Sequence, residues 1–191
     1  GDLQRAERFA RQHIDWLLER LEGRPDHVAL RLGDLVPLRG KEHLIVPTGQ
    51  LRGLVSTGQA VCGTPALLVP GAEEHAPRKV TTWLKGQAKA DLTERAEDHA
   101  AKIGKKIAAI SVRDTKSRWG SCASNGRLSF SWRLILAPPD ILDYVAAHEV
   151  AHLKEMNHSD RFWRLCEELA PQTPEARVWL KEHGVRLHGY G

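Results

Sequence analysis

The stretch AAHEVAHLKEMNH, residues 146–158, contains the side chains best suited to chemistry. His148 and His152 are four residues apart, and Glu149 follows the first. On an α-helix this spacing puts the two imidazoles about 40° apart around the axis and one turn along it, so both reach one zinc ion. Glu149 then lies on the flank, where its carboxylate contacts a zinc-activated water rather than the metal. The HExxH pattern predicts a hydrolytic zinc site with Glu149 as the general base.

The residues around this motif are apolar, because ILDYVAA precedes it and VA lies within it. Two imidazoles and a carboxylate on a buried helix cost free energy unless a partner compensates, and metal ligation would compensate. The alternative is a helix whose two histidines are hydrogen-bonded core residues that bind no metal. We favour the metal site.

A catalytic zinc ion usually has three protein ligands and one water. His158 is the leading third ligand, although in an unbroken helix it would lie about 15 Å from His148 along the axis. The helix is therefore expected to end after about Lys154, so that the chain turns back. The rival third ligand is a glutamate from the next helix, either Glu167 or Glu168.

Several elements are expected to position the motif. Helical spacing of apolar residues predicts a long helix over 77–103, and KIAAISVRD (106–114) reads as a strand. Residues 119–136 resemble a hairpin, with Asn125-Gly126 as a two-residue turn and an apolar residue at every second position from Leu128 to Leu134. APPD then opens the motif helix. Two further helices are expected, one over 159–169 and one from Thr173 to just before Gly184.

The first part of the chain has a different pattern. Residues 2–21 predict an amphipathic helix. Short apolar runs between 28 and 69, cut by glycines, predict a small set of strands: VALRL, LVPL, HLIVP, AVCG and ALLVP. We expect two domains, an N-terminal helix and β-part over 1–75 and a catalytic part over 76–191.

Composition excludes several classes of protein. The 191 residues are 41% hydrophobic, and no apolar run approaches the roughly 18–20 residues of a membrane span. The three cysteines are odd in number and far apart, which disfavours a disulfide framework. With no signal-peptide pattern, these features predict a cytoplasmic protein that does not bind membranes.

Positive charge is concentrated between residues 101 and 133, where eight lysines and arginines stand against a single acid, a net charge of +7. A solvated face is one interpretation. The other is weak binding of nucleic acid or a nucleotide. The cations are Lys102, Lys105, Lys106, Arg113, Lys116, Arg118, Arg127 and Arg133, and the acid is Asp114.

Other residues carry weaker signals. Trp119, Trp132 and Trp163 are expected in the core or in a cleft wall rather than as substrate platforms. Gly120 allows either a close backbone approach or a tight bend, and Cys122 is interpreted as structural.

Four polar residues are weak candidates for supporting roles. Asp143 and Glu155 are candidate partners of the ligand imidazoles. His183 and His188 lie on a C-terminal tail, where they would be surface residues or would contact a developing oxyanion.

The segment SRWGSCASNGRLSFSWRLILAPPDILDYVAAHEVAHLKEMNHSDRFW resembles the YgjP-like metallopeptidase family, which is related to the SprT-like and WLM zinc peptidases. The resemblance is specific over about residues 116–163. It implies that His148, His152 and His158 bind zinc and that Glu149 is the catalytic base. It also implies an α+β, zincin-like fold, in which a mixed sheet with a hairpin packs on the HExxH helix beside a small N-terminal β-part.

The leading hypothesis is a zinc metallopeptidase, in which the strand from Leu128 to Trp132 offers an edge to an extended polypeptide substrate. A nucleotide pyrophosphatase is the alternative enzyme, since that role has been attributed to a member of the family. The alternative outside enzymes is a nucleic-acid or partner-binding module stabilised by zinc. A structural zinc would require a fourth protein ligand, and none is obvious in the sequence.

Overall fold

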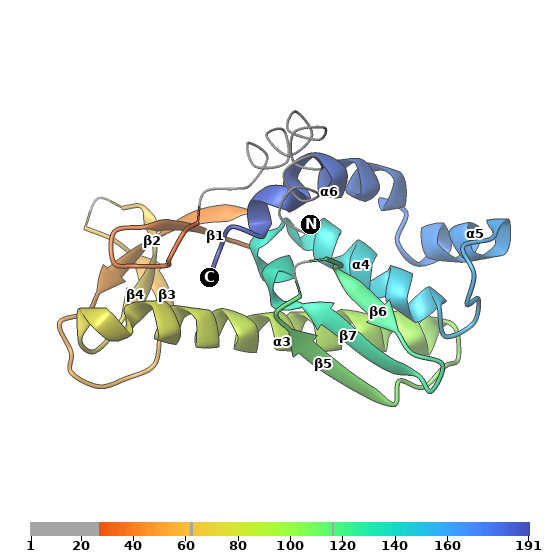
Figure 1. The fold of residues 1–191 in the computed structure, drawn as a ribbon, viewed down its shortest axis with the longest axis horizontal. Helices are drawn as coiled ribbons and strands as arrows, with labels where there is room; N and C mark the ends of the chain where they lie inside the picture. Colours follow the sequence, from red (N-terminus) through yellow and green to blue (C-terminus); the bar gives the residue numbers. More distant parts are fainter. Residues whose placement is uncertain (1–26, 62, 116) are drawn as a thin grey trace, which may run out of the picture.

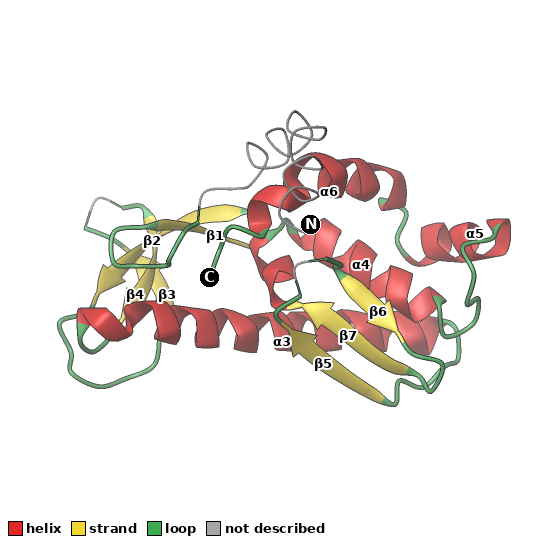
Figure 2. Ribbon diagram, in the orientation of Figure 1, coloured by secondary structure: helices red, strands yellow, loops and turns green. Residues whose placement is uncertain are grey.

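The computed structural model describes residues 27–61, 63–115 and 117–191. The predicted helix over 2–21 lies outside the described residues. The described chain is a mixed α+β structure in which two small sheets lie along one long helix, one toward each end (Figure 1, Figure 2). Three shorter helices cover the second sheet and its neighbourhood.

The long helix α3, Ala76–Lys102, confirms the helix predicted over 77–103. Apolar residues recur at every fourth position along it. Each of them is fully buried: Val80, Leu84, Ala88, Leu92 and Ala96. Gly104, with φ of 64°, lies just beyond its end, in the left-handed conformation that glycine adopts without strain. A short 3₁₀ helix, η1 (Glu73–His75), leads into it.

The first sheet confirms a small N-terminal β-part. It consists of β1 (Leu35–Leu38), β2 (Lys41–Pro47), β3 (Ser56–Gln59) and β4 (Pro65–Val69) in the order β1-β2-β4-β3. Only the β2–β4 pair is parallel, so the sheet is mixed.

Two of the predicted N-terminal strands are wrong. VALRL forms no strand because Leu30 and Gly33 have positive φ values of 59° and 89°, and Val28 makes only an isolated bridge to Tyr190. The described residues of AVCG (Ala60, Val61 and Gly63) lie between β3 and β4 and form no strand there, since the Gly63 amide donates to the Ala60 carbonyl at 2.8 Å.

The second sheet contains the expected hairpin. Its strands are β5 (Ala109–Arg113), β6 (Gly120–Cys122) and β7 (Arg127–Ser131), in the order β5-β7-β6. β5 and β7 are parallel and β6 is antiparallel to β7. Because β7 is the central strand, the predicted peptide-binding edge over 128–132 is wrong; the edge of the described sheet on the hairpin side is β6.

The hairpin differs from the prediction at both ends. The Gly126 amide donates to the Ala123 carbonyl at 2.9 Å, so the turn is longer than two residues, and Gly126 takes the left-handed conformation after it. β7 ends at Ser131, and residues Trp132–Leu136 form the 3₁₀ helix η2. All five residues of η2 are buried, so apolar residues there follow each other instead of alternating.

The remaining helices are α4 (Pro139–Ala151), α5 (Asp160–Leu169) and α6 (Thr173–Leu187). The first two confirm the predicted helices. The predicted end of the last helix before Gly184 is wrong, because α6 continues through Gly184 to Leu187. A glycine is suited to position 184, since a Cβ there would lie 3.1 Å from the ring of Trp119. Among the described residues, no helix has the length and apolar character to cross a bilayer.

The turn between β1 and β2 ties the first sheet to the rest of the molecule. The amides of Arg39 and Gly40 donate to the carbonyls of Ile135 (2.7 Å) and Leu136 (3.2 Å) in η2. The Arg39 guanidinium also makes two 2.8 Å hydrogen bonds to Asp91 on α3. The division into domains over 1–75 and 76–191 stays a prediction.

Gly40 supplies a test of this docking. It has φ of 76°, and a Cβ there would lie 3.1 Å from backbone and side-chain atoms of Pro138. Gly33 also has positive φ, but a Cβ there meets nothing within 4 Å. Both Gly→Ala changes are expected to cost about 1–2 kcal/mol of strain, and Gly40→Ala is expected to cost clearly more. Denaturant unfolding measures both, and equal losses would show that the contact with Pro138 is unimportant.

Candidate metal centre

Three histidines come together where α4 ends. The helix stops at Ala151, about three residues earlier than predicted, and a turn closed by the Glu155 amide on the Ala151 carbonyl (2.9 Å) reverses the chain. His148 lies in the last turn of α4, His152 is its C-cap, and His158 lies in the loop before α5. One nitrogen from each imidazole lies within 4.8 Å of the other two.

The imidazoles are oriented by contacts on their far sides. His152 Nδ1 is 3.1 Å from the Glu155 carbonyl oxygen, so it donates its proton there and leaves Nε2 as an acceptor. His148 Nδ1 faces the Tyr144 hydroxyl at 3.4 Å, while its Nε2 lies 3.1 Å from His158 Nε2. Nε2 of each ring therefore points to the shared centre.

Phe162 forms the apolar support of the cluster. Its ring is fully buried, and its centroid lies 4.9, 4.5 and 4.7 Å from those of His148, His152 and His158. Phe162 comes from the first turn of α5, so the packing of α5 against α4 fixes all three imidazoles. This role is not visible in the sequence, because Phe162 has no spacing relation to the motif.

Burial keeps the imidazoles in the form that binds metals. Burial, together with the charges of the neighbouring imidazoles, lowers the pKa of His148 to about 4. Burial also lowers the pKa of His152, against hydrogen bonds that the ring donates to the backbone and that raise it. Neutral imidazole is the form that ligates a metal ion.

The geometry and the donor set fit zinc. Tetrahedral zinc with Zn–N distances of about 2.0–2.1 Å holds its ligand nitrogens roughly 3.4 Å apart. The separation of 3.1 Å between two Nε2 atoms is close to that value, and all three ligand nitrogens lie within 4.8 Å of one another. Within the described residues the group that could share one ion comprises these three histidines, with no fourth protein ligand.

Glu149 lies against the edge strand β6. Its side chain is 5% exposed, and burial raises its pKa to about 7, partly offset by the charge of Arg118. A Cβ at Gly120 would lie 2.6 Å from Cγ and 2.8 Å from Cδ of Glu149, and closer still to Oε1. Of the two roles open to Gly120 in the sequence, the structure shows the close approach: a glycine leaves room for the carboxyl group.

The alternative ligands are not brought to the cluster. Glu167 and Glu168 are exposed on α5 and lie outside the three-histidine group. The neighbouring side of the site is formed by Trp163, whose ring stacks on His158 with centroids 5.6 Å apart. The Arg177 guanidinium lies 4.1 Å from the centroid of Trp163. Trp163 therefore lines the cluster, as the cleft-wall interpretation predicted.

The two expected supporting carboxylates are placed differently. Asp143 contacts no ligand imidazole in the described chain; it accepts hydrogen bonds from His99 Nε2 and Gln172 Nε2, each at 2.8 Å. Its predicted role is wrong because it points to the α3 side of α4. Glu155 does support His152, but through its backbone carbonyl instead of its carboxylate.

The predictions for the other aromatic residues and for Cys122 have different outcomes. Trp132 is fully buried in the core. Trp119 stacks on His188 with centroids 4.5 Å apart, so His188 belongs to a packed contact rather than to a tail. Burial raises the pKa of Cys122, helped by the charge of Glu149, which keeps the thiol protonated and agrees with a structural role.

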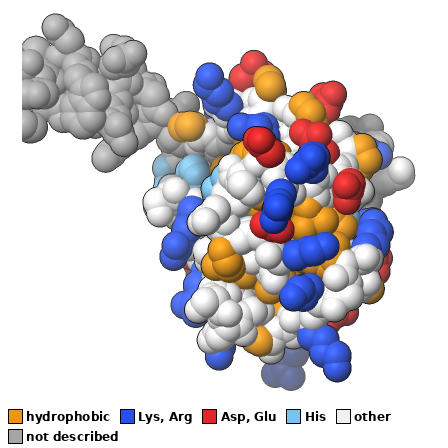
Figure 3. Space-filling model, turned by 90° about the vertical axis from the view of Figure 1, so that its right-hand side faces the viewer, with side chains coloured by type: hydrophobic (Ala, Val, Ile, Leu, Met, Phe, Trp, Pro, Cys, Tyr) orange, Lys and Arg blue, Asp and Glu red, His pale blue; other side chains and the backbone are white. Residues whose placement is uncertain are grey.

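The basic stretch is not exposed throughout. Arg133 is fully buried, pairs with Asp114 and donates to the carbonyls of Tyr190 (3.0 Å) and Gly191 (3.3 Å). Lys116 is outside the described residues, and the other six cations are exposed. On the face shown in Figure 3, lysines and arginines are mixed with acidic and apolar side chains. Binding of nucleic acid through this stretch stays a prediction.

Comparisons with known proteins agree with a metal site. The family model described as YgjP-like, metallopeptidase domain, matches residues 1–183. A UTP pyrophosphatase of Escherichia coli (strain K12) is 38% identical over 50 residues, and the match spans 24% of this chain and only 30% of that protein. The metallopeptidase zymogen of Pyrococcus abyssi abylysin aligns with 47% of this chain and 93% of its own, at 22% identity and a TM-score of 0.42, which is too low to support an argument.

The network around Asp143 predicts a pH-dependent stability. Burial opposes ionisation of Asp143, but the hydrogen bonds from His99 and Gln172 and the charge of Arg95 outweigh it and hold its pKa below the usual value. Its stabilising effect is therefore present above the unfolded pKa of about 3.9 and is lost as pH falls through the lower folded pKa.

Asp143→Asn is expected to lower the free energy of unfolding at pH 7 by about 1–3 kcal/mol, the value of hydrogen bonds to a charged group. The difference from wild type should shrink below about pH 4. Asp140→Asn, three residues before Asp143 on the same helix and in no described ion pair, is the control. A difference that stays constant down to pH 3 would contradict the ionised state of Asp143.

Proposed function

The chain belongs to the YgjP-like metallopeptidase family, and from that membership we propose that it is a zinc-dependent hydrolase that cleaves polypeptides. The observation that carries the proposal is the convergence of three imidazole nitrogens within 4.8 Å of one another, with Glu149 one residue from the first of them. His148, His152 and His158 would hold the zinc ion. Bound there, zinc supplies Lewis acidity and lowers the pKa of water.

Glu149 is proposed as the general base. Its carboxyl group accepts a proton from the attacking water and later donates it to the leaving amine. Gly120 supports this role because it lets the carboxyl group lie against the backbone of β6. The base is thereby held on the same side of α4 as the edge strand.

β6 is the proposed binding edge for the substrate. It pairs with β7 on one side, and in the described sheet no strand pairs with its other side. An extended peptide adds to such an edge through backbone hydrogen bonds, which tolerate many sequences. Because Gly120 of β6 touches Glu149, a peptide along this strand would have its backbone near the proposed base.

Hydrolysis of a nucleotide phosphoanhydride is the second candidate. Two exposed arginines border the site: the charge of Arg118 acts on Glu149, and that of Arg177 acts on His148. Neither forms an ion pair with a carboxylate of the described chain, so both are available to an anionic substrate. The partial similarity to a UTP pyrophosphatase favours the same chemistry, although it spans less than a third of that protein.

A binding module with a structural zinc is less well supported, because a structural site is closed by a fourth protein ligand. The three-histidine group of the described residues contains none. A cytoplasmic location is also proposed, and the three widely spaced cysteines support it.

The ligand set is tested by zinc affinity. Alanine at His148, His152 or His158 is expected to weaken zinc binding by more than about 100-fold, beyond the 10–100-fold loss typical of removing a partner of a ligand. Glu167→Ala and Glu168→Ala should leave the affinity unchanged, and His183→Ala serves as a matched histidine control. A competition titration with a chromophoric chelator measures all of them. Strong loss in Glu167→Ala or Glu168→Ala with none in His158→Ala would assign the third ligand to α5.

The reaction is tested with zinc-loaded protein on an unfolded polypeptide, such as reduced casein, and on UTP in parallel. Glu149→Gln should keep the zinc and lower the rate by at least about 100-fold, because an amide cannot accept the proton. Gly120→Ala should also keep the zinc and lower the rate, since its Cβ displaces the carboxyl group; Ser121→Ala is the control on the same strand.

The outcomes separate the candidates. Cleavage of casein that Glu149→Gln abolishes supports the peptidase. Hydrolysis of UTP alone, lost in the same variant, supports the second candidate. Wild-type rates in Glu149→Gln would show that the base is elsewhere.

A further inference from the structure

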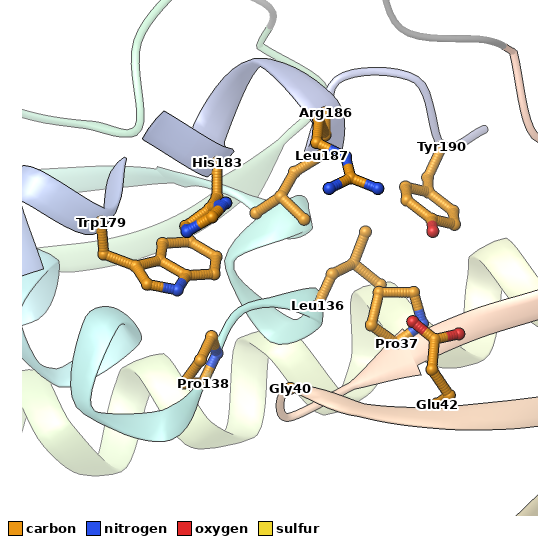
Figure 4. A pocket seen from close by; sticks show the side chains of 10 residues that line it. All are labelled: Pro37, Gly40, Glu42, Leu136, Pro138, Trp179, His183, Arg186, Leu187 and Tyr190. Carbon is orange, nitrogen blue, oxygen red and sulfur yellow. The ribbon is translucent and has the colours of Figure 1, made fainter. Parts of the chain in front are cut away.

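A pocket lies at the junction between the first sheet and α6, away from the three histidines of the candidate metal centre (Figure 4). Its volume is about 280 Å³, and its walls come from β1, β2, η2, the start of α4 and α6. Pro138 lines it and precedes His148 by ten residues, which corresponds to about 15 Å along α4. The pocket is therefore separate from the candidate metal centre.

The walls of this pocket are held in place by described contacts. The β1–β2 turn is hydrogen-bonded to η2, and Gly40 packs against Pro138. On the other side, the buried Arg133 donates to the carbonyl of Tyr190, which fixes the backbone that carries the tyrosine ring. A pocket formed at a fixed junction between a sheet and a helix loses little conformational entropy when a ligand binds.

Opposite charges face this space from two elements. The Arg186 guanidinium extends from α6 and the Glu42 carboxylate from β2, on different sides of the pocket (Figure 4). Both charges act on the Tyr190 hydroxyl, whose pKa is raised by burial and by Glu42 and lowered by Arg186. Within the described part of the chain, no hydrogen bond or ion pair occupies either charged group.

The rest of the lining is aromatic and apolar. Trp179 and His183 lie on one side with ring centroids 5.0 Å apart, and Leu136 and Leu187 are buried beneath. Such a surface suits an apolar or aromatic side chain, while separated opposite charges suit the two ends of a zwitterion. A ligand with only negative charge would leave Glu42 without a partner and close to its own charge.

We propose that this pocket binds a short peptide with free termini, with its carboxylate on Arg186, its ammonium group on Glu42 and an apolar side chain against Trp179. A peptide of two or three residues separates its terminal charges by several ångströms, as a site with charges on opposite walls requires. The proposal does not depend on the reaction at the histidines, because none of them lines the pocket.

The test is calorimetric titration of the zinc-loaded protein with the dipeptide Ala-Phe and with its C-terminal amide and N-acetyl forms. Blocking either terminus should weaken binding by about tenfold or more, the effect of losing one charge-assisted hydrogen bond. Arg186→Gln should lose the preference for the free carboxylate, and Glu42→Gln the preference for the free amine. Lys181→Gln, exposed on the same helix, is the matched control.

Nuclear magnetic resonance locates the binding. Ala-Phe should shift the indole N–H of Trp179 and the amide of Gly40 in wild type and in Glu149→Gln. Absence of binding at millimolar Ala-Phe would overturn the proposal. So would equal affinity for the amidated peptide, or binding that Arg186→Gln leaves intact, since each would place the peptide elsewhere.

Discussion

The burial of α4 on several sides is the constraint on which the rest of the structure depends. The helix packs on α3, η2, β6, α5 and α6. Close packing is possible because small residues line it: Ala146, Ala147 and Ala151 are fully buried, opposite a face of α3 that includes Ala88 and Ala96. A helix held in this way is a rigid support, so His148 and Glu149 have fixed positions before any ligand binds.

Burial also explains why the polar residues on and near this helix have hydrogen-bond partners. Each polar group that leaves water needs a partner, because an unpaired one costs free energy. Asp143 is bonded to His99 and Gln172, which links α4 to α3 and to the segment before α6. The three histidines contact a carbonyl, a phenol and each other, and one nitrogen of each ring lies in a group that could hold a metal ion.

The need of buried polar groups for hydrogen-bond partners also produces contacts that connect the two sheets. Arg133 is fully buried, yet Asp114 and two C-terminal carbonyls satisfy its guanidinium. It joins the loop after β5 to the chain beyond α6, while the β1–β2 turn joins the first sheet to η2. These contacts hold the walls of the pocket between Arg186 and Glu42, at the opposite end of α4 from the histidine cluster. One core thus carries the candidate metal centre and the proposed peptide pocket at separate places.

The sequence by itself determined what depends on local spacing. The 3.6-residue period set α3 and α4, the HExxH spacing placed His148, Glu149 and His152 on one helix, and the turn signal at Gly126 located the hairpin. Only the tertiary structure decided which distant groups meet. It brought His158 back over Phe162 and placed Glu149 against Gly120. It also buried Arg133 and paired Asp143 with His99 instead of with a histidine of the candidate metal centre. The physical reason is that these contacts join segments far apart in the chain, and their partners are chosen by packing and by the pairing of buried polar groups, which no local period encodes.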